Sequence, residues 1–425
     1  MEGNVVMSAR ELARVRVLEQ VLLGGMSLTQ AARVLDVTYR HARRLKRRYG
    51  ELGAVGLMHG SRGRPVAHAL PEGLAERVVT LHEQRYGNFN DCHFTQMLKE
   101  HEGIVLGRET VRQILRKAGK PPKRTRRPRK HRARRPRKLR RGIMVQWDGS
   151  PHRWFGPDHP PCCLLTAIDD ADSSLLAALF VPAECAVGYL RLLDMMLRRH
   201  GAPLSIYQDR HTIHERSDDH WSLEEEILGT RFPTHLGRAL QELGIRAIPA
   251  YSPQAKGRIE RGFATLQDRL IAELEFHGIT DIDTANRWLE DVFIDRHNSQ
   301  FATTPKEPGS AFRRVTARDR YIRIGFAYEA TVANDNCVRL GGIMIDIPPG
   351  DSRRSYAKAT VIVRQHLDGA WSVWYGDRKI AAHPPTDLTE PIRSWKRRTA
   401  RDPKGAKRML QVYLSSRPAP FPEGT

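Results

Sequence analysis

Apolar residues recur at helical spacing along the first fifty positions of the chain. Leu12, Val15, Leu18 and Leu22 predict a helix over Glu11–Leu23. A Gly-Gly pair then ends that pattern, and Ser27 stands where an N-cap residue is expected. Two further helices separated by a tight turn follow, and the last is rich in arginine. This order predicts a helix-turn-helix domain over residues 1–50, with helices at Leu28–Leu35 and Thr38–Tyr49.

A second helical region follows a Gly-rich segment, Gly50–Ala69, for which we expect a loop. Arg62 and Arg64 in that segment can lie in a minor groove or belong to a plain linker. Residues 51–119 are therefore expected to hold the linker and a winged-helix-like DNA-binding unit. Its predicted helices are Pro71–Tyr86, Asp91–His101 and Arg108–Ala118.

Residues 120–142 form the most biased stretch of the chain. Between Lys120 and Arg141, 14 of 22 residues are Lys or Arg and four are Pro. Such a composition cannot bury a core, so we expect disorder in isolation and a role as a linker that follows DNA. A nuclear-localisation signal is the alternative interpretation.

Short apolar runs then alternate with helical patterns over residues 143–300. Three strands, a helix, a strand, a helix, a strand and a long helix are the order of a ribonuclease-H-like α/β domain. The polar stretch Arg210–Thr234 does not fit this order and is interpreted as an insertion. The predicted elements are Ile143–Asp148, Cys162–Asp169, Ser174–Val181, Glu184–His200, Leu204–Gln208, His235–Leu243, Ile245–Ala250 and Gln254–Leu274, with one more helix at Ile282–His297.

The last part of the chain changes period from helical to alternating. A connector is expected over residues 301–327, and five short strands in residues 328–385 predict a small β-barrel. Residues 386–425 are expected to form a basic, mobile tail. The fold class is therefore multidomain α+β, with helix-turn-helix modules, a ribonuclease-H-like core and a C-terminal small barrel.

The charge is distributed unevenly along the chain. Residues 1–141 hold 33 Lys and Arg against 12 Asp and Glu, whereas residues 142–300 hold 15 against 24. The last 125 residues hold 22 against 12, and the whole chain carries +22. Basic ends indicate a polyanionic partner, and double-stranded DNA fits best. The acidic middle would repel DNA unless cations offset its carboxylates.

Five cysteines without a CxxC pair argue against a disulfide framework and against a zinc site. No signal-peptide pattern and no run of eighteen apolar residues is found. A reducing cytoplasm fits these features.

Three acids follow short apolar elements in the middle region. Asp148 ends the first predicted strand, Asp209 ends the fourth, and Glu260 lies on the long helix. A carboxylate at the end of a buried strand usually needs a cation, because burying an unpaired charge is unfavourable. Singly, each is more often a cap or turn residue; together, they suggest a divalent metal site.

The motifs around these acids resemble those of DDE transposases of bacterial insertion sequences, in the retroviral-integrase superfamily and close to the ISNCY group. They are Gln146–Trp154, Tyr207–Asp209 and Tyr251–Arg261, and the last contains Ser-Pro-x-x-x-Gly-x-x-Glu. The resemblance covers roughly Ser27–Pro308.

This resemblance implies that Asp148, Asp209 and Glu260 hold two Mg²⁺ or Mn²⁺ ions and are the catalytic residues. Two ions about 4 Å apart can activate the attacking oxygen and stabilise the leaving oxygen. The spacing from Asp209 to Glu260 exceeds the usual family pattern, and the insertion offers rival acids. Those rivals are Glu215, Asp218, Asp219 and Glu224–Glu226; Asp169 and Asp170 are interpreted as surface or turn acids.

The candidate DNA contacts are basic residues of the helix-turn-helix domain, the Gly-rich segment, the second helical region and the basic stretch, together with one lysine of the last motif. Lys256 lies one turn before Glu260 and either contacts substrate or forms a simple i,i+4 pair. Arg258 and Arg261 lie off that line and either contact flanking DNA or pair with an acid. The candidates are Arg40, Arg43, Arg44, Arg47, Arg62, Arg64, Arg112, Lys123, Arg124, Arg126, Arg127 and Lys256.

Three functions compete at this stage. A transposase would bind the terminal inverted repeats of its element, cleave 3′ ends and join them to target DNA as a homodimer or larger assembly. A non-catalytic DNA-binding regulator derived from a transposase is the alternative. A nuclease for RNA–DNA hybrids is disfavoured by two DNA-reading modules ahead of the core.

Overall fold

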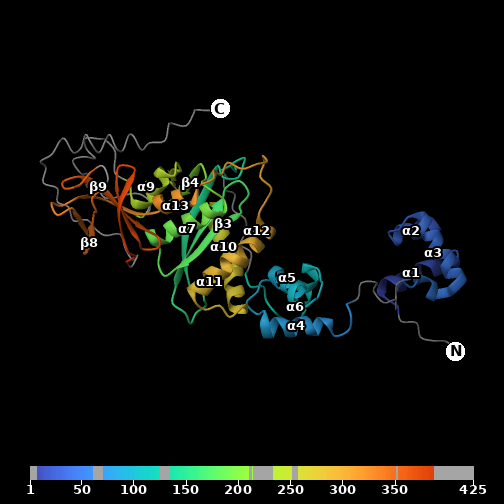
Figure 1. The fold of residues 1–425 in the computed structure, drawn as a ribbon. Helices are drawn as coiled ribbons and strands as arrows, with labels where there is room; N and C mark the ends of the chain where they lie inside the picture. Colours follow the sequence, from blue (N-terminus) through green and yellow to red (C-terminus); the bar gives the residue numbers. More distant parts are fainter. Residues whose placement is uncertain are drawn as a thin grey trace. The chain divides into compact units, whose positions relative to one another are not determined.

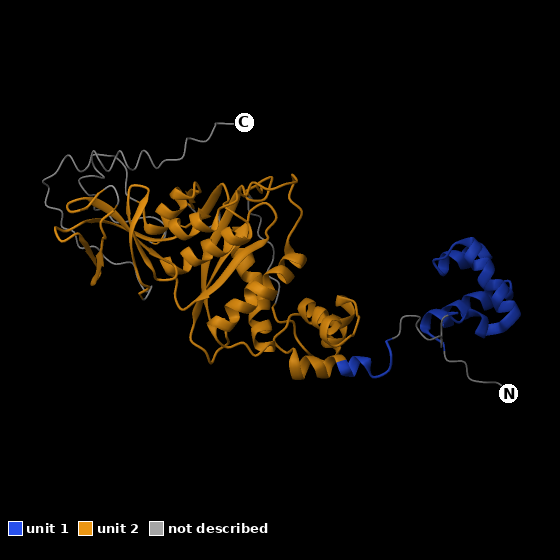
Figure 2. Ribbon diagram, in the orientation of Figure 1, with its two compact units in different colours: residues 1–77 blue, residues 78–425 orange. Residues whose placement is uncertain are grey.

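The structure is a computed structural model that describes residues 7–60, 70–124, 135–209, 213, 233–250, 257–350 and 353–386. It divides into two units, residues 1–77 and residues 78–425 (Figure 2). Each unit has its own core, so the two are described separately. None of the helices in these described ranges is both long and apolar enough to span a membrane.

The first unit confirms the predicted helical domain. It contains α1 (Ala9–Leu22), α2 (Leu28–Val34) and α3 (Tyr39–Leu52). Ser8, Ser27 and Thr38 cap the three N-termini with their side-chain oxygens, as Ser27 was expected to do. The predicted loop is wrong at its start, since α3 runs to Leu52 and a 3₁₀ turn, η1 (Gly53–Leu57), follows. Leu57 is buried against Val15, Leu18 and Leu45, and this packing orders the turn.

Residues 78–124 belong to the second unit together with the α/β region (Figure 1). They include most of α4 (Leu74–Arg85), α5 (Asp91–His101) and α6 (Arg108–Lys117), close to the predicted ranges. No strand that could form a wing occurs among described residues 70–124. The helices pack on the C-terminal half of α10 (Gly257–Phe276), where Tyr86 stacks on Phe276 with ring centroids 5.4 Å apart.

A five-stranded sheet with the order β3-β2-β1-β4-β5 is the centre of the second unit. The first three strands are antiparallel neighbours, and β4 and β5 run parallel to β1. This is the ribonuclease-H-like order, and the predicted strands are confirmed. They are β1 (Met144–His152), β2 (Cys162–Asp169), β3 (Leu175–Val181), β4 (Ser205–Gln208) and β5 (Arg246–Pro249).

Helices cover both faces of this sheet. Alternate residues of β2 separate into two cores: Cys163, Leu165 and Ala167 pack with α7 (Ala186–Arg199) and α9 (His235–Glu242). Leu164 and Ile168 pack on the other face with α10 and with three shorter elements. Those elements are α11 (Ile282–Trp288), the π-helical turn η3 (Leu289–Phe293) and α12 (Ile294–Phe301).

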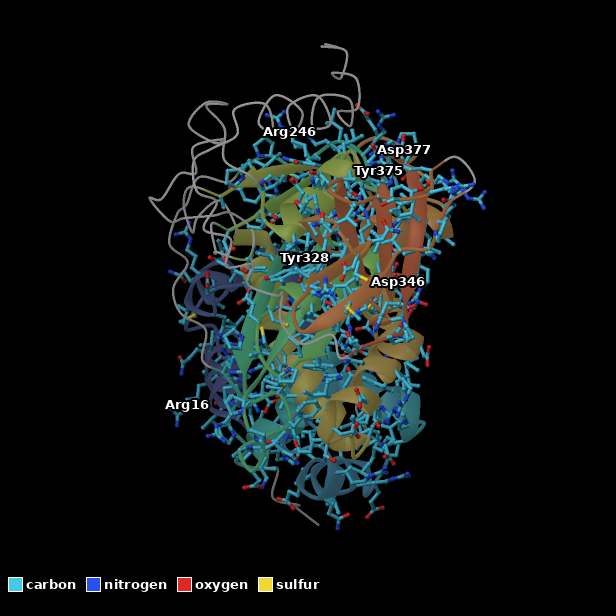
Figure 3. All side chains as sticks on the ribbon, turned by 60° about the vertical axis from the view of Figure 1, so that its left-hand side comes forward. Arg16, Arg246, Tyr328, Asp346, Tyr375 and Asp377 are labelled. Atoms are coloured by element: carbon cyan, nitrogen blue, oxygen red, sulfur yellow. The ribbon has the colours of Figure 1, made fainter. Side chains whose placement is uncertain are left out.

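The predicted C-terminal barrel is wrong. After α13 (Ala317–Arg323), the strands form an open four-stranded sheet, β11-β10-β9-β6, and a separate β7-β8 hairpin. In Figure 3, Tyr375 and Asp377 mark the β10–β11 end of the sheet and Asp346 marks the hairpin. The strands are β6 (Gly325–Thr331), β7 (Cys337–Leu340), β8 (Ile343–Asp346), β9 (Thr360–His366), β10 (Trp371–Tyr375) and β11 (Arg378–His383).

The open sheet buries its apolar face against the α/β region instead of closing on itself. Phe326, Val363 and Trp371 belong to the same continuous core as Leu236 and Leu240 of α9. Alternation along a strand reports that one face is buried, but it does not report what covers that face. The physical reason for the error is therefore that α9 supplies the cover that a barrel would have made from its own strands.

Candidate active site

Two of the three predicted acids lie at matching positions on neighbouring parallel strands. β1 pairs with β4 in a register that sets Met144 beside Ser205 and Gln146 beside Tyr207. Continuing that register by two residues places Asp148 beside Asp209, and both are half-buried. A hydrogen bond of 3.1 Å from Trp147 Nε1 to Gln208 Oε1 supports the register one residue earlier. Neighbouring strands lie about 4.8 Å apart, so the two carboxylates share one edge of the sheet.

The side chain of Asp148 belongs to the sheet face that α10 covers. Side chains two apart on a strand point to the same face, so Gln146, Asp148 and Ser150 form one row. Gln267 of α10 donates from Nε2 to Ser150 Oγ at 3.3 Å, which fixes the face of this row. Cross-strand from Asp148 lies Thr166, which is fully buried.

Glu260 lies in the first turn of α10 and is exposed. It precedes Gln267 by seven residues, so the two project from the same side of the helix. Two residues before it, Arg258 binds Asp170, which in turn accepts a hydrogen bond from Gln146 Nε2 at 2.6 Å. Glu260 therefore lies on its helix between Arg258, which is linked through Asp170 to Gln146, and Gln267, which contacts Ser150. Gln146 and Ser150 flank Asp148 on β1.

The donor chemistry of this face fits a divalent cation, although the described residues do not form a complete metal site. No three His, Cys, Asp or Glu side chains among them are grouped as cation ligands. Two oxygens on this face, Thr166 Oγ1 and Gln146 Oε1, are buried and have no hydrogen-bond partner within the described part of the chain. Carboxylates and uncharged oxygens are the ligands that Mg²⁺ and Mn²⁺ prefer, and a hydrated ion could satisfy such oxygens.

Glu184 is a fourth acid near the site that the sequence did not single out. It directly precedes Cys185, the N-cap residue of α7, and its Oε1 accepts a hydrogen bond of 2.6 Å from the Tyr189 hydroxyl. A Cβ atom on Gly149 would lie 2.9 Å from Glu184 Cδ, so this carboxylate is packed against the residue after Asp148. No local pattern distinguishes Glu184 from an ordinary helix-start acid.

The electrostatics of nearby groups confirm that several carboxylates gather here. Burial, then the Glu184 carboxylate, raise the pKa of Tyr189, and Asp148 and Asp209 add to the increase. Burial and then Glu184 likewise raise the pKa of Cys163 to about 12. The site is therefore a region of negative potential, as a cation site requires.

The interpretation of Asp169 and Asp170 as surface or turn acids is wrong about the surface, because both are buried. Asp169 is the last residue of β2, whereas Asp170 does lie in the turn that follows it. Asp169 accepts backbone hydrogen bonds from Gly142 at 2.7 Å and Ala171 at 2.8 Å, and burial raises its pKa to about 6. Asp170 binds Arg135 and Arg258. Of the two options for Arg258, the structure shows the acid contact.

Those candidate DNA contacts of the first unit that the structure describes lie on one helix. All four are exposed on α3; Arg47 has a weak pair with Glu51 at 3.7 Å, and Arg44 lies 3.2 Å from His41. The four are Arg40, Arg43, Arg44 and Arg47.

The described candidates in the second unit contact acidic side chains of this same chain. Arg112 forms a bidentate pair with Glu109 on α6. Lys123 and Arg124 both lie near Asp268 of α10, at 3.5 and 3.9 Å. The remaining candidates lie outside the described residues: Arg62, Arg64, Arg126, Arg127 and Lys256. So does most of the insertion, of which Ile213, Pro233 and Thr234 are described.

Comparisons with known proteins bear on both units. Residues 13–65 match a family described as a helix-turn-helix domain. A Sinorhizobium fredii protein, y4bF, whose name describes it as a transposase, is 39% identical over 319 residues, which are 75% of this chain and 68% of the relative. The transposase for insertion sequence IS1202 of Streptococcus pneumoniae is 32% identical over 333 residues, covering 70% and 69%.

Solved structures show a looser likeness. A simian T-cell lymphotropic virus intasome in complex with a PP2A regulatory subunit matches at 16% identity and a TM-score of 0.31, over 75% of this chain and 100% of that chain. An HTLV-2 integrase catalytic core domain in complex with magnesium matches at 15% and 0.25, over 36% and 87%. These scores add nothing to the assignment, which rests on the sequence relatives. Both relatives exceed 30% identity over two thirds of their length, and the chain belongs to the family of insertion-sequence transposases.

Proposed function

We propose that this transposase binds the terminal inverted repeats of its element and catalyses 3′-end cleavage and strand transfer through Asp148, Asp209 and Glu260. The observation that supports it is the matched register of Asp148 and Asp209 together with the bracketing of Glu260 over the same row of β1. Grouping carboxylates from three separate elements is unfavourable unless cations offset their charge.

These three carboxylates would hold two Mg²⁺ or Mn²⁺ ions. Such ions lower the pKa of an attacking water and stabilise the leaving oxygen. Asp148 and Asp209 at the edge of the sheet and Glu260 on α10 would supply the carboxylate oxygens that hold the ions. The chain's own contribution is to fix the carboxylates on a rigid strand pair and helix. The rival acids of the insertion are set aside because they precede the fifth strand, whereas Glu260 follows it in the first turn of a helix.

DNA recognition would begin with α3, whose arginines project from one short helix. Each phosphate that they neutralise steepens the dependence of binding on salt. Arg112 on α6 and Lys123 and Arg124 after it would extend the contact in the second unit. Arg62, Arg64, Arg126, Arg127 and Lys256 are proposed as further contacts from the sequence. Pairing two element ends implies a homodimer or a larger assembly.

The test measures cleavage and joining of labelled DNA that carries the terminal repeats flanking this gene. Wild type, Asp148→Asn and Glu260→Gln are compared in Mg²⁺, Mn²⁺ and EDTA. Asp295→Asn is the matched control, because that carboxylate is 72% exposed on α12 and pairs with Arg199. Joining should require metal, fall to background in the two active-site variants and persist in the control, with end binding nearly unchanged throughout.

Two outcomes would overturn parts of this proposal. Joining that survives in Glu260→Gln would move the third ligand into the insertion. Tight end binding without chemistry from the wild type would favour the alternative function, a regulator that binds the repeats and does not cut.

A further inference from the structure

Asp170, in the turn between β2 and β3, is a buried acceptor for four donors. Its side chain is 0% exposed. It accepts from Arg135 Nη2 at 2.5 Å, from Gln146 Nε2 at 2.6 Å and from the Lys138 backbone nitrogen at 2.9 Å. Arg258 Nη1 is the fourth donor. A carboxylate buried this deeply is stable only with such compensation, so the four donors and the acid form one unit.

This unit reaches all three elements that carry the predicted catalytic acids, each time two residues before the acid. Gln146 precedes Asp148, and Arg258 precedes Glu260. The third connection is a cation–π contact, in which Arg135 Cζ lies 5.8 Å from the ring centroid of Tyr207, two residues before Asp209.

The contact with α10 is a double one. Arg258 donates from Nη1 to Asp170 and from Nη2 to the backbone oxygen of Arg135 at 2.5 Å. Arg258 is the second residue of α10, and its side chain is only 13% exposed. The next residue, Ile259, is fully buried in the core beneath the helix. The start of α10 is therefore held by one apolar anchor and one ionic anchor.

Arg135 is part of the basic linker rather than of the sheet. Residues 135–141 lie against the β2–β3 turn, where Arg137 Nη1 donates to Ala171 O at 3.2 Å and to Ser173 Oγ at 2.8 Å. The expectation of disorder applies to the basic stretch in isolation; in the whole chain its last residues pack against this turn. Burial against an acidic turn supplies the compensation that the composition alone cannot.

We propose that Asp170, Arg135 and Arg258 are positioning residues that fix the first turn of α10, and with it Glu260, relative to Asp148 and Asp209. The inference rests on the proposed role of these three acids. Under this proposal, the end of the basic linker helps to set the positions of the active-site carboxylates. A linker that follows DNA would then influence the geometry of those carboxylates as well.

The first test is hydrogen exchange of the full-length protein, which does not depend on metal or on activity. Amides of residues 261–264 bond to carbonyls of the first turn of α10, so they report its opening. Arg135→Gln and Arg258→Gln should raise their exchange rate about 10-fold. Arg137→Gln is the matched control: it removes the same charge from the same linker but leaves the Asp170 contacts, and it should leave these amides unchanged.

The second test is kinetic. Arg135→Gln should lower the maximal rate of joining and raise the Mn²⁺ concentration needed for half-maximal activity. Its affinity for element ends should match that of Arg137→Gln, since both lose one linker charge. Arg258→Lys, which keeps a cation beside Asp170, should recover part of the rate that Arg258→Gln loses. If Asp170→Asn fails to fold, the arginine variants still decide the question.

Unchanged exchange of residues 261–264 in both arginine-to-glutamine variants would overturn the proposal. So would equal exchange in Arg135→Gln and Arg137→Gln. Failure of the proposed function has a different signature, namely joining that persists in Asp148→Asn, and the exchange results would stand apart from it.

Discussion

Replacing Glu242 by Gln should weaken the attachment of the C-terminal sheet to the α/β region. Glu242 ends α9 and accepts from Arg238 Nη1 at 2.8 Å, one turn earlier on the same helix. It also accepts from both terminal nitrogens of Arg364 on β9, at 3.0 and 3.1 Å. The Glu242 carboxylate therefore joins two arginines that come from the two sides of this junction.

The magnitude follows from burial and from the number of charged hydrogen bonds. The side chains of Glu242, Arg238 and Arg364 are 22, 19 and 16% exposed. Burial alone would raise the pKa of Glu242, but the two guanidinium groups outweigh it and hold that pKa below its usual value. Removing one partner of a fully buried pair costs about 3–5 kcal/mol. With this partial exposure, we expect Glu242→Gln to cost about 2–3 kcal/mol of unfolding free energy.

The assay is urea unfolding followed by tryptophan fluorescence. All seven tryptophans lie at or beyond residue 147, so the signal reports only on the second unit. Trp147 on β1 and Trp371 on β10 are both buried, which places one probe on each side of the junction. Asp335→Asn is the control, because the Asp335–Arg339 pair is 48 and 55% exposed and solvent screens it, so its loss should change stability far less.

Equal losses in Glu242→Gln and Asp335→Asn would refute the reasoning. A wild-type protein in which the Trp371 region unfolds well before the Trp147 region would refute it too. Either result would mean that the C-terminal sheet is an autonomous domain, despite the core that it shares with α9.

Two further predictions concern the same junction. Burial, and then Arg238, lower the pKa of His235 to about 4. Its ring packs on Phe326 and Tyr328, and protonation is favoured only in the unfolded chain. The stability that the neutral His235 ring supplies is complete above pH 6.5 and is lost as the pH falls towards 4. Between pH 7 and 5, wild type should therefore lose about 2 kcal/mol of unfolding free energy relative to His235→Phe. A difference in melting temperature between the two proteins that stays constant across this range would contradict the prediction. Gly325→Ala should cost more than about 2 kcal/mol, because φ is +147° and a Cβ would lie 2.3 Å from Gln365 O. Thermal melting against Gly376→Ala, where φ is +58° and the space is open, checks this, and equal costs would exclude the steric cause.

Most of the fold of the α/β region could be predicted, and the clearest signals came from the strands that are buried on both faces. β2 and β3 are buried at every position, so each reads as a continuous apolar run. The end of β1 was predicted too early, because strand pairing overrides the local preference of the sequence for a turn. The strand continues past Gly149 to His152, since β2 pairs with it over that whole length. The prediction of a barrel was wrong for a related reason, because the closure of a sheet depends on contacts with residues that are distant in the sequence.

The acidic residues likewise divide into those that the sequence pattern indicates and those that it does not. Asp148 and Asp209 could be found because each directly follows or ends an apolar run on a strand. Asp170 could not be recognised, since its partners Arg135 and Arg258 lie 35 and 88 residues away. Glu184 reaches the site only through the packing of α7 on β2, and no spacing in the sequence reports that contact.

Helix α10 has different attachments at its two ends. Its first turn carries Glu260, while its second half holds the α4–α6 region through Asn90 to Asp268, Asn88 to Glu275 and Tyr86 on Phe276. A helix rises about 1.5 Å per residue, so these attachment points lie roughly 12–24 Å from Glu260 along a stiff rod. If α4–α6 holds DNA, as proposed, the length of this one helix would set how far that DNA lies from the carboxylates.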